Sequence, residues 1–236
     1  PRLVSTSGGY AYLKIADGCS QRCTYCTIPR IKGPLVSRSP DVVLREAEEL
    51  VRGGARELIL VSQNTSAYGM DFSRDHRPQL VQLLRDMDRL PGIGLIRLLY
   101  LYPTLVNREL LETIAASHHV AHYVDVPLQH TDPSVLKAMG RPWAPGSAAR
   151  IVARVRRIIP DAAIRSTFIV GFPGESEVQF RHLLADLEVL QLDHAAAFAC
   201  SREDLAPSSR YTGQVRRGTK TRRLREFMAV QQRVSL

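Results

Sequence analysis

Short apolar segments alternate with amphipathic segments through most of this 236-residue chain. The apolar runs contain few polar residues, as expected for strands that are covered on both faces. Between them, apolar residues recur at the spacing of an amphipathic helix. The apolar runs are residues 10–16, 57–62, 95–102, 123–128, 163–171 and 194–201, and the expected helices are residues 40–52, 78–90, 107–117, 133–139, 146–159 and 175–190.

This order of strands and helices predicts an α/β fold in which parallel strands are joined by right-handed crossovers. Local signals at the helix starts agree with it. Ser39-Pro40 and Asp132-Pro133 each place a capping residue before a proline at the first helical position. The pattern is compatible with an open barrel-like sheet and equally with a doubly wound sheet.

Charge and cysteine usage limit the class of protein. The 32 Lys and Arg against 23 Asp and Glu give a net charge of +9, which suits an RNA or nucleoprotein partner but also an ordinary solvated Arg-rich surface. No stretch approaches the roughly 18 uninterrupted apolar residues of a membrane span. Four cysteines without an export signal exclude a secreted disulfide scaffold. We therefore expect a cytoplasmic protein with no membrane partner.

Three cysteines lie within eight residues, directly after the first predicted strand: Cys19, Cys23 and Cys26, spaced C-x3-C-x2-C. A structural zinc site usually has four ligands, and no histidine lies near this loop. Cys200 is distant in sequence and is interpreted as a small buried hydrophobe. An iron–sulfur cluster with three Cys-bound irons and one open iron fits this set, and it is favoured over zinc or unliganded thiols.

Longer segments resemble a known family. Residues 10–26 (YAYLKIADGCSQRCTYC) resemble the start of a radical S-adenosylmethionine (SAM) domain. Further segments are similar to methylthiotransferases of that class, and the form LVSQNTSAYG is that of the ribosomal-protein enzymes rather than the tRNA-modifying ones. These segments are residues 27–38, 60–69, 124–130, 139–142 and 165–175, and the similarity runs from about residue 10 to residue 201.

The resemblance implies a partial (β/α)6 TIM-like barrel of the radical SAM type with a basic C-terminal helix, residues 219–234. It also implies one 4Fe–4S cluster, held by the three cysteines, whose open iron binds SAM. An electron passed through the cluster would cleave SAM to Met and a 5′-deoxyadenosyl radical. The implied SAM-contacting residues are Tyr25, Gln63, Asn64, Gln129, Arg165, Gly171, Pro173, Gly174 and Glu175.

Each of these residues also has a purely structural interpretation. Gln63 and Asn64 could cap the turn after their strand, and Gln129 could be a structural polar group at a strand end. Arg165, inside an apolar strand, could form an internal ion pair instead of binding the SAM carboxylate. Glu175 could be an acidic residue that interacts only with a helix dipole.

The implied activity is methylthiolation of the β-carbon of an aspartyl residue in ribosomal protein S-twelve. The implied partners are that protein or the small ribosomal subunit and an electron donor such as flavodoxin or ferredoxin. A second 4Fe–4S cluster is expected on a domain absent from this sequence. Three alternatives stay open: a tRNA adenosine methylthiotransferase, a non-catalytic basic RNA- or ribosome-binding module with a structural metal, and a core that binds cluster and SAM but completes no reaction.

The expected domain organisation has three parts. Residues 1–9 are interpreted as a linker remnant and residues 10–204 as the radical SAM core. Residues 205–236 form a basic extension, expected to be exposed and to lead toward a missing substrate-recognition domain. Its first 21 positions, 205–225, hold seven cations and no acid, which suits a solvated helix or a docking surface for RNA or another domain.

Overall fold

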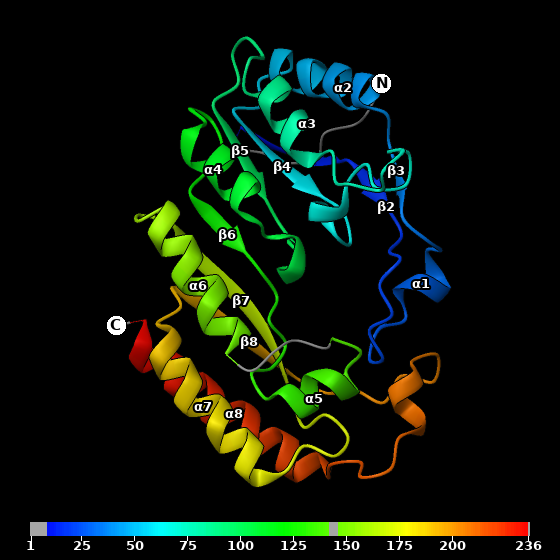
Figure 1. Ribbon diagram of the computed structural model, residues 1–236, viewed down its shortest axis with the longest axis vertical. Helices are drawn as coiled ribbons and strands as arrows, with labels where there is room; N and C mark the ends of the chain where they lie inside the picture. The colour runs from blue at the N-terminus through cyan, green and yellow to red at the C-terminus, as the bar shows by residue number, and fades with distance from the viewer. Residues whose placement is uncertain (1–8, 142–145, 236) are drawn as a thin grey trace. The chain divides into compact units, whose positions relative to one another are not determined.

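The computed structural model describes residues 9–141 and 146–235, which divide into two compact units (Figure 1). The first unit comprises the chain up to Cys19 together with Lys32–Asp125 and Val155–Ala162. The second comprises Ser20–Ile31, Val126–Arg154 and the chain from Ala163 onward. The chain therefore passes from one unit to the other within the cysteine loop.

The first unit contains a parallel sheet in the order β1-β4-β5, formed by β1 (Tyr10–Lys14), β4 (Glu57–Val61) and β5 (Leu95–Leu98). Leu58 and Leu60 of the central strand are fully buried. The same unit contains helices α2 (Pro40–Arg52), α3 (Leu80–Met87) and α4 (Arg108–Ala116). Strand β6 (Tyr123–Asp125) follows α4 in the chain. Helix α2 buries Val43, Ala47 and Leu50, which recur at i, i+4 and i+7 on one face.

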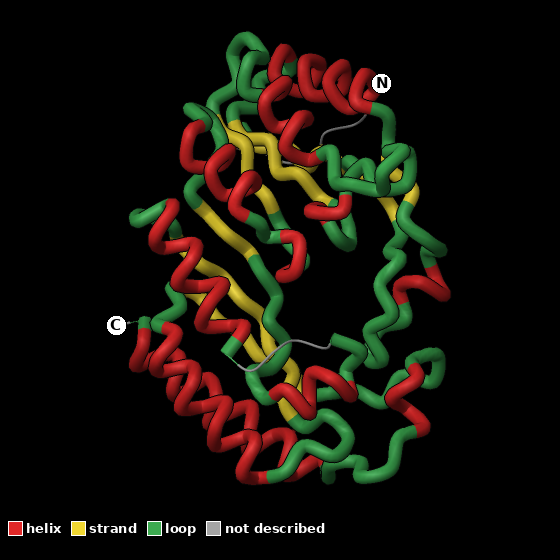
Figure 2. Tube along the Cα trace, in the orientation of Figure 1, coloured by secondary structure: helices red, strands yellow, loops and turns green. Residues whose placement is uncertain are grey.

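The second unit is built on parallel strands β7 (Ala163–Val170) and β8 (His194–Ala199). The segment that follows β6 runs beside β7, where Gln129 pairs with Phe168. Helices α7 (Glu177–Leu190) and α8 (Arg217–Val234) run side by side over these strands, as Figure 2 shows in red beside the yellow strands. The remaining helices are α5 (Pro133–Ala138) and α6 (Ser147–Ile158), which leads back into the first unit.

The predicted alternation is confirmed, since each of the six apolar runs contains a strand and each predicted helix is present. The predicted and observed helix bounds differ where a capping residue fixes the start of the helix. The helix expected at residues 175–190 begins at Glu177, because the side chain of Ser176 caps it and forms a capping box with Gln179. The sequence pattern missed the short elements: β2 (Ala16–Asp17), β3 (Val36–Ser37), α1 (Ile28–Ile31) and the 3-10 turns η1 (Thr65–Ala67), η2 (Pro103–Leu105) and η3 (Pro207–Arg210).

The C-terminal helix is part of the packed second unit. Helix α8 begins at Arg217, two residues before the predicted start, and packs against β8 and α7. Phe227 is fully buried, and its ring centroid lies 5.2 Å from that of Phe168 in β7. The preceding segment, expected to be exposed, buries Ala206, Ser208 and Ser209, so that expectation is wrong for these residues. The domain division at residues 204 and 205 stays a prediction, and residues 1–8 of the expected linker lie outside the described residues.

Within the described residues, no helix combines the length and the apolar character needed to cross a bilayer.

Candidate functional site

The cysteine loop starts in the first unit and continues in the second. Cys19 belongs to the first unit, and its amide donates to the Gly33 carbonyl at 3.1 Å. The preceding Gly18 has a φ of +70°, and a Cβ there would overlap the Pro34 carbonyl oxygen. Glycine is therefore required where the chain enters the loop.

The second half of the loop is anchored to the end of α5. The amide of Thr24 donates to the Met139 carbonyl at 3.0 Å, and its hydroxyl donates to the Ala138 carbonyl at 2.8 Å. Arg141, 3% exposed, donates to the Tyr25 hydroxyl and to the Pro127 carbonyl, both at 2.9 Å. These contacts hold the segment that carries Cys23, Tyr25 and Cys26 in one conformation.

The thiol chemistry of this segment suits a soft metal centre. Cys23 and Cys26 are partly buried, and the Cys26 sulfur accepts from the Ile28 amide at 3.4 Å. Burial raises the pKa of the Cys26 thiol, and the Ile28 amide partly opposes that increase. Burial likewise raises the pKa of the Tyr25 hydroxyl. A thiolate at Cys26 therefore needs a positively charged centre to stabilise it, and iron bound by sulfur ligands supplies that charge.

No three Cys, His, Asp or Glu side chains in residues 9–141 and 146–235 are placed as ready-made metal ligands. The donor types fit an iron–sulfur cluster, because the loop offers sulfur, no histidine and an N–H group aimed at sulfur. The assignment of Cys19, Cys23 and Cys26 as cluster ligands stays a prediction from their spacing.

Gly140 provides a test of how the loop is anchored. Its φ is +71°, and an added Cβ would lie 2.6 Å from the Arg22 carbonyl oxygen. We expect Gly140→Ala to displace the loop and to lower the iron content of anaerobically reconstituted protein severalfold. Gly54→Ala is the matched control, because its φ is +99° and no atom lies within 4 Å of the added Cβ. Both variants carry the left-handed backbone cost of about 1 kcal/mol, so equal iron loss in both would contradict the prediction.

Gln63 and Asn64 follow β4 in the first unit. Asn64 is 3% exposed, and its side-chain oxygen accepts from the Ser66 hydroxyl at 2.9 Å. That hydroxyl in turn accepts from the Tyr102 amide at 2.8 Å, which ties the turn to the end of β5. The Asn64 side chain is therefore held by Ser66 and does not cap η1 as weighed for it, and its contact with SAM stays a prediction. The buried side-chain oxygen of Gln63 has no hydrogen-bond partner, which leaves that atom available to a ligand.

Gln129 pairs beside β7, whereas Arg165 lies within that strand. Gln129 is 9% exposed and has a left-handed φ of +71°, an unusual conformation for a residue with a side chain. Its amide donates to the Thr167 carbonyl and its carbonyl accepts from the Ile169 amide, both at 2.8 Å. Arg165 lies on β7 and is partly buried. The roles of Gln129 and Arg165 in binding SAM stay predictions.

The glycine-rich loop after β7 contains Gly171, Pro173, Gly174 and Glu175. Both glycines have left-handed φ values, +72° and +83°. The Glu175 side chain is fully buried, and it accepts from the Gly171 amide and, at 3.0 Å, from the Phe172 amide. Glu175 therefore does more than meet a helix dipole, because its carboxylate organises the loop itself.

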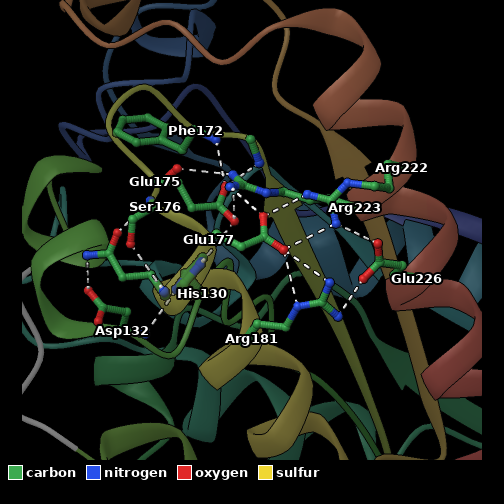
Figure 3. A network of polar contacts seen from close by, with 12 residues as sticks. His130, Asp132, Phe172, Glu175, Ser176, Glu177, Arg181, Arg222, Arg223 and Glu226 are labelled. Carbon is green, nitrogen blue, oxygen red and sulfur yellow. Dashed lines mark hydrogen bonds and ion pairs between the residues drawn. The ribbon is translucent and has the colours of Figure 1, made fainter.

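A polar network surrounds this loop in the second unit (Figure 3). Glu175 lies beside His130 and Arg223, while the neighbouring Glu177 binds Arg222 at 2.7 Å and Arg181 at 3.1 Å. The hydrogen bond from Arg222 is the main reason that the pKa of Glu177 falls to about 2. The outer pairs are solvated, whereas Glu175 and Arg223 are buried.

The lowered pKa of Glu177 predicts a pH dependence. A folded-state pKa of about 2 against an ordinary value of 4.5 means that ionised Glu177 stabilises the fold above about pH 4.5. That stabilisation is lost as the pH falls from 4.5 toward 2. We expect the difference in melting temperature between the parent and Glu177→Gln to be constant at neutral pH and to shrink across this range. A difference that does not change with pH would contradict the assignment.

Sequence reasoning missed Arg141 and Arg223 and interpreted the cations of the C-terminal helix as surface charge. One signal was present for Arg223. It lies four residues before Phe227 and seven before Val230, on the helical face that is buried. Arg141 had no such signal, because its partners Tyr25 and Pro127 are remote in sequence.

Comparison of the sequence with family models and with curated proteins gives consistent matches. A model of the radical SAM superfamily matches residues 13–187. The chain is 46% identical over 235 residues to the ribosomal protein uS12 methylthiotransferase RimO of Moorella thermoacetica, covering 100% of this chain and 54% of that protein. It is 41% identical over 234 residues to the protein of the same name from Alkaliphilus oremlandii, covering 99% and 53%. The chain spans about half the length of the curated relatives it matches.

Solved structures support the fold. The radical S-adenosylmethionine methyltransferase TsrM from Kitasatospora setae has a TM-score of 0.69 at 19% identity, covering 88% of this chain and 42% of that one. Coproporphyrinogen III oxidase (HemN) from Escherichia coli has a TM-score of 0.65 at 15% identity, covering 94% and 52%. At these identities the likeness concerns the fold alone, and it confirms the predicted α/β class.

Proposed function

The chain belongs to the radical SAM superfamily, and from that premise we propose that it is the catalytic core of a methylthiotransferase that modifies ribosomal protein uS12. One observation carries the proposal: 46% identity, along the whole of this chain, to a protein named for that activity. The LVSQNTSAYG segment at residues 60–69, which resembles the ribosomal-protein enzymes, agrees with it.

Superfamily membership implies a 4Fe–4S cluster and SAM. We assign the cluster ligands to Cys19, Cys23 and Cys26. The bound cluster and SAM together supply the radical that abstracts a hydrogen atom from carbon. A C–H group at the β-carbon of an aspartyl residue is too weakly acidic for a side-chain base, so this chemistry suits the proposed substrate.

The chain's own residues bind and orient the cofactor in this proposal. The side-chain oxygen of Gln63 offers an acceptor without a partner, and the left-handed backbone at Gln129 fixes a second strand end. In this proposal the backbone of Gly171, Pro173 and Gly174 contacts SAM. The Glu175 carboxylate holds that backbone by accepting from the Gly171 and Phe172 amides. Tyr25, Asn64 and Arg165 complete the proposed SAM-binding set.

The complete reaction involves further components. We propose a second 4Fe–4S cluster on a domain outside this sequence, an electron donor such as flavodoxin or ferredoxin, and a cytoplasmic setting in which uS12 or the small ribosomal subunit is available. The relatives are about twice as long as this chain, which leaves room for such a domain.

The first experiment tests the core chemistry. The chain is reconstituted anaerobically with iron and sulfide, supplied with SAM and dithionite, and assayed for 5′-deoxyadenosine. Release of 5′-deoxyadenosine supports the radical SAM assignment. A correctly loaded cluster without release argues against it and favours the binding-module alternative.

The second experiment tests the substrate. This chain replaces the matching segment of the Moorella thermoacetica relative, and the chimera is offered small ribosomal subunits and, separately, tRNA. Mass spectrometry of uS12 and of tRNA nucleosides then reports which one gains a methylthio group. Modification of uS12 supports the proposal, whereas modification of tRNA alone would overturn it. The unaltered Moorella thermoacetica relative is the positive control, which shows that the assay detects methylthiolation.

A further inference from the structure

We propose that Arg223 of helix α8 is a positioning residue for the Gly171–Glu175 loop and acts through the Glu175 carboxylate. The inference rests on the proposed function, in which the backbone of this loop binds SAM. It assigns to the C-terminal helix a role in shaping the cofactor site, although the sequence of that helix suggests only a basic surface.

The Arg223 guanidinium is buried and faces two carboxylates, that of the buried Glu175 and that of Glu177, whose Oε2 accepts from Nη2 at 3.3 Å. Its side chain is 4% exposed, and Nη1 lies 3.5 Å from Glu175 Oε1. The same nitrogen donates to the main-chain carbonyl of Glu175 at 3.1 Å. The ring of Phe180 lies 5.3 Å from the guanidinium carbon and shields it from solvent. A carboxylate with no exposure to water needs such a partner, because an unpaired buried charge is strongly unfavourable.

The carboxylate links α8 to the loop because its two oxygens have different partners. Oε2 accepts from the Gly171 and Phe172 amides, which fixes the first turn of the loop. Oε1 faces Arg223 at 3.5 Å and His130 Nε2 at 3.8 Å. Oε1 makes no hydrogen bond, so α8 acts on Glu175 through charge, and Glu175 in turn holds the loop backbone through Oε2 (Figure 3).

His130 faces the same carboxylate oxygen as Arg223. It is fully buried, and its Nδ1 accepts from the Asp132 amide at 2.9 Å. In the neutral ring this places the proton on Nε2, the atom that faces Glu175. His130 directly follows Gln129, so the Glu175 carboxylate contacts both α8 and the segment that pairs with β7.

A second residue of α8 holds the same loop. The side chain of Lys220 covers Gly171, where an added Cβ would lie 2.5 Å from Lys220 Cγ. Its ammonium donates to the Cys200 carbonyl, just after β8, at 2.6 Å. Through Lys220, helix α8 thus contacts the chain immediately after both β7 and β8. These contacts help to hold the Gly171–Glu175 loop.

The test compares Arg223→Met with Arg225→Met. Arg225 is exposed on the same helix, so this control removes an equal charge and length without touching Glu175. Hydrogen–deuterium exchange of peptides containing Gly171 and Phe172 is measured on the full chain without cluster or SAM. We expect exchange there to accelerate about tenfold in Arg223→Met, since losing a charged partner loosens the carboxylate, and to stay near the parent rate in Arg225→Met.

SAM affinity of the reconstituted protein is the second readout. We expect Arg223→Met to weaken SAM binding about tenfold and Arg223→Lys to weaken it less, because lysine keeps the charge but not the planar fork. If Arg223→Met does not fold, Arg223→Lys, which keeps a charge beside Glu175, is measured by hydrogen–deuterium exchange instead. Faster exchange and weaker SAM binding are expected there too.

The outcomes separate the two proposals. Parent-like exchange at Gly171 and Phe172 in the folded Arg223 variant would overturn the positioning role. Faster exchange with unchanged SAM affinity would also overturn it, since the loop would then not serve the cofactor. A parent protein that binds no SAM would refute the proposed function, while the exchange measurement would still report whether Arg223 orders the loop.

Discussion

Cys23→Ala is expected to lose its iron–sulfur cluster and at least ~100-fold in 5′-deoxyadenosine formation, because a lost ligand costs more than the 10–100-fold typical of supporting residues. Cys23 is one of three thiols on a partly buried loop, so its removal leaves two sulfur ligands nearby. The fold should survive, since the loop makes its anchoring contacts through Thr24 and Tyr25 instead.

The measurements are iron per chain, visible absorption after anaerobic reconstitution, and 5′-deoxyadenosine after SAM and dithionite are added. Cys200→Ala is the matched control, because Cys200 is buried directly after β8 and is assigned no ligand role. It should keep both iron and activity. A Cys23→Ala protein with full iron content and SAM cleavage would refute the ligand assignment. Stoichiometric zinc in the parent would instead favour a structural metal.

Phe227→Ala is expected to lower the free energy of unfolding by about 3–5 kcal/mol, the usual cost of emptying a large aromatic site in a core. Phe227 is fully buried, and its ring lies 5.2 Å from that of Phe168 between centroids. This loss is a large share of the ~5–15 kcal/mol free energy of unfolding of a typical domain. The variant therefore tests whether α8 belongs to the core of the second unit.

Urea unfolding followed by circular dichroism gives the measurement. Met228→Ala provides the comparison, because Met228 is the next residue along α8 and is 42% exposed. Its cost should stay within about 0.5 kcal/mol. Equal, small effects of the two substitutions would mean that α8 is only loosely attached, and the Arg223 proposal would then fail with it.

The α/β class was predictable because helices and strands follow local periodicity. Helix α2 illustrates this, because its first residue, Pro40, and its apolar face all lie within 13 consecutive residues. The short β2–β3 pair was not predictable, because it joins Ala16 to Ser37 across the cysteine loop, and two-residue strands carry no periodic signal.

The site was predictable to a smaller extent. The cysteine triad lies within eight residues, so its spacing alone indicates a metal centre, whereas the cofactor role of the glycine-rich loop came from the family resemblance. The partners that organise them are remote: Arg141 reaches Tyr25 across 116 positions, and Arg223 reaches Glu175 across 48. The spacing of Arg223 from Phe227 and Val230 indicates its buried face, but no local pattern specifies Glu175 as its partner, because that choice depends on how α8 packs.

The sequence by itself determined the strand–helix order, the cysteine spacing and the segments shared with radical SAM enzymes, because each of these is a short-range property of the chain. Tertiary structure alone decided that a basic helix would bury Arg223 against Glu175, that Arg141 would hold the loop of Cys23 and Cys26, and that Gln129 would adopt a left-handed backbone. These outcomes depend on which distant surfaces meet, since burial makes an unpaired charge or amide so unfavourable that the fold must supply a partner from elsewhere in the chain.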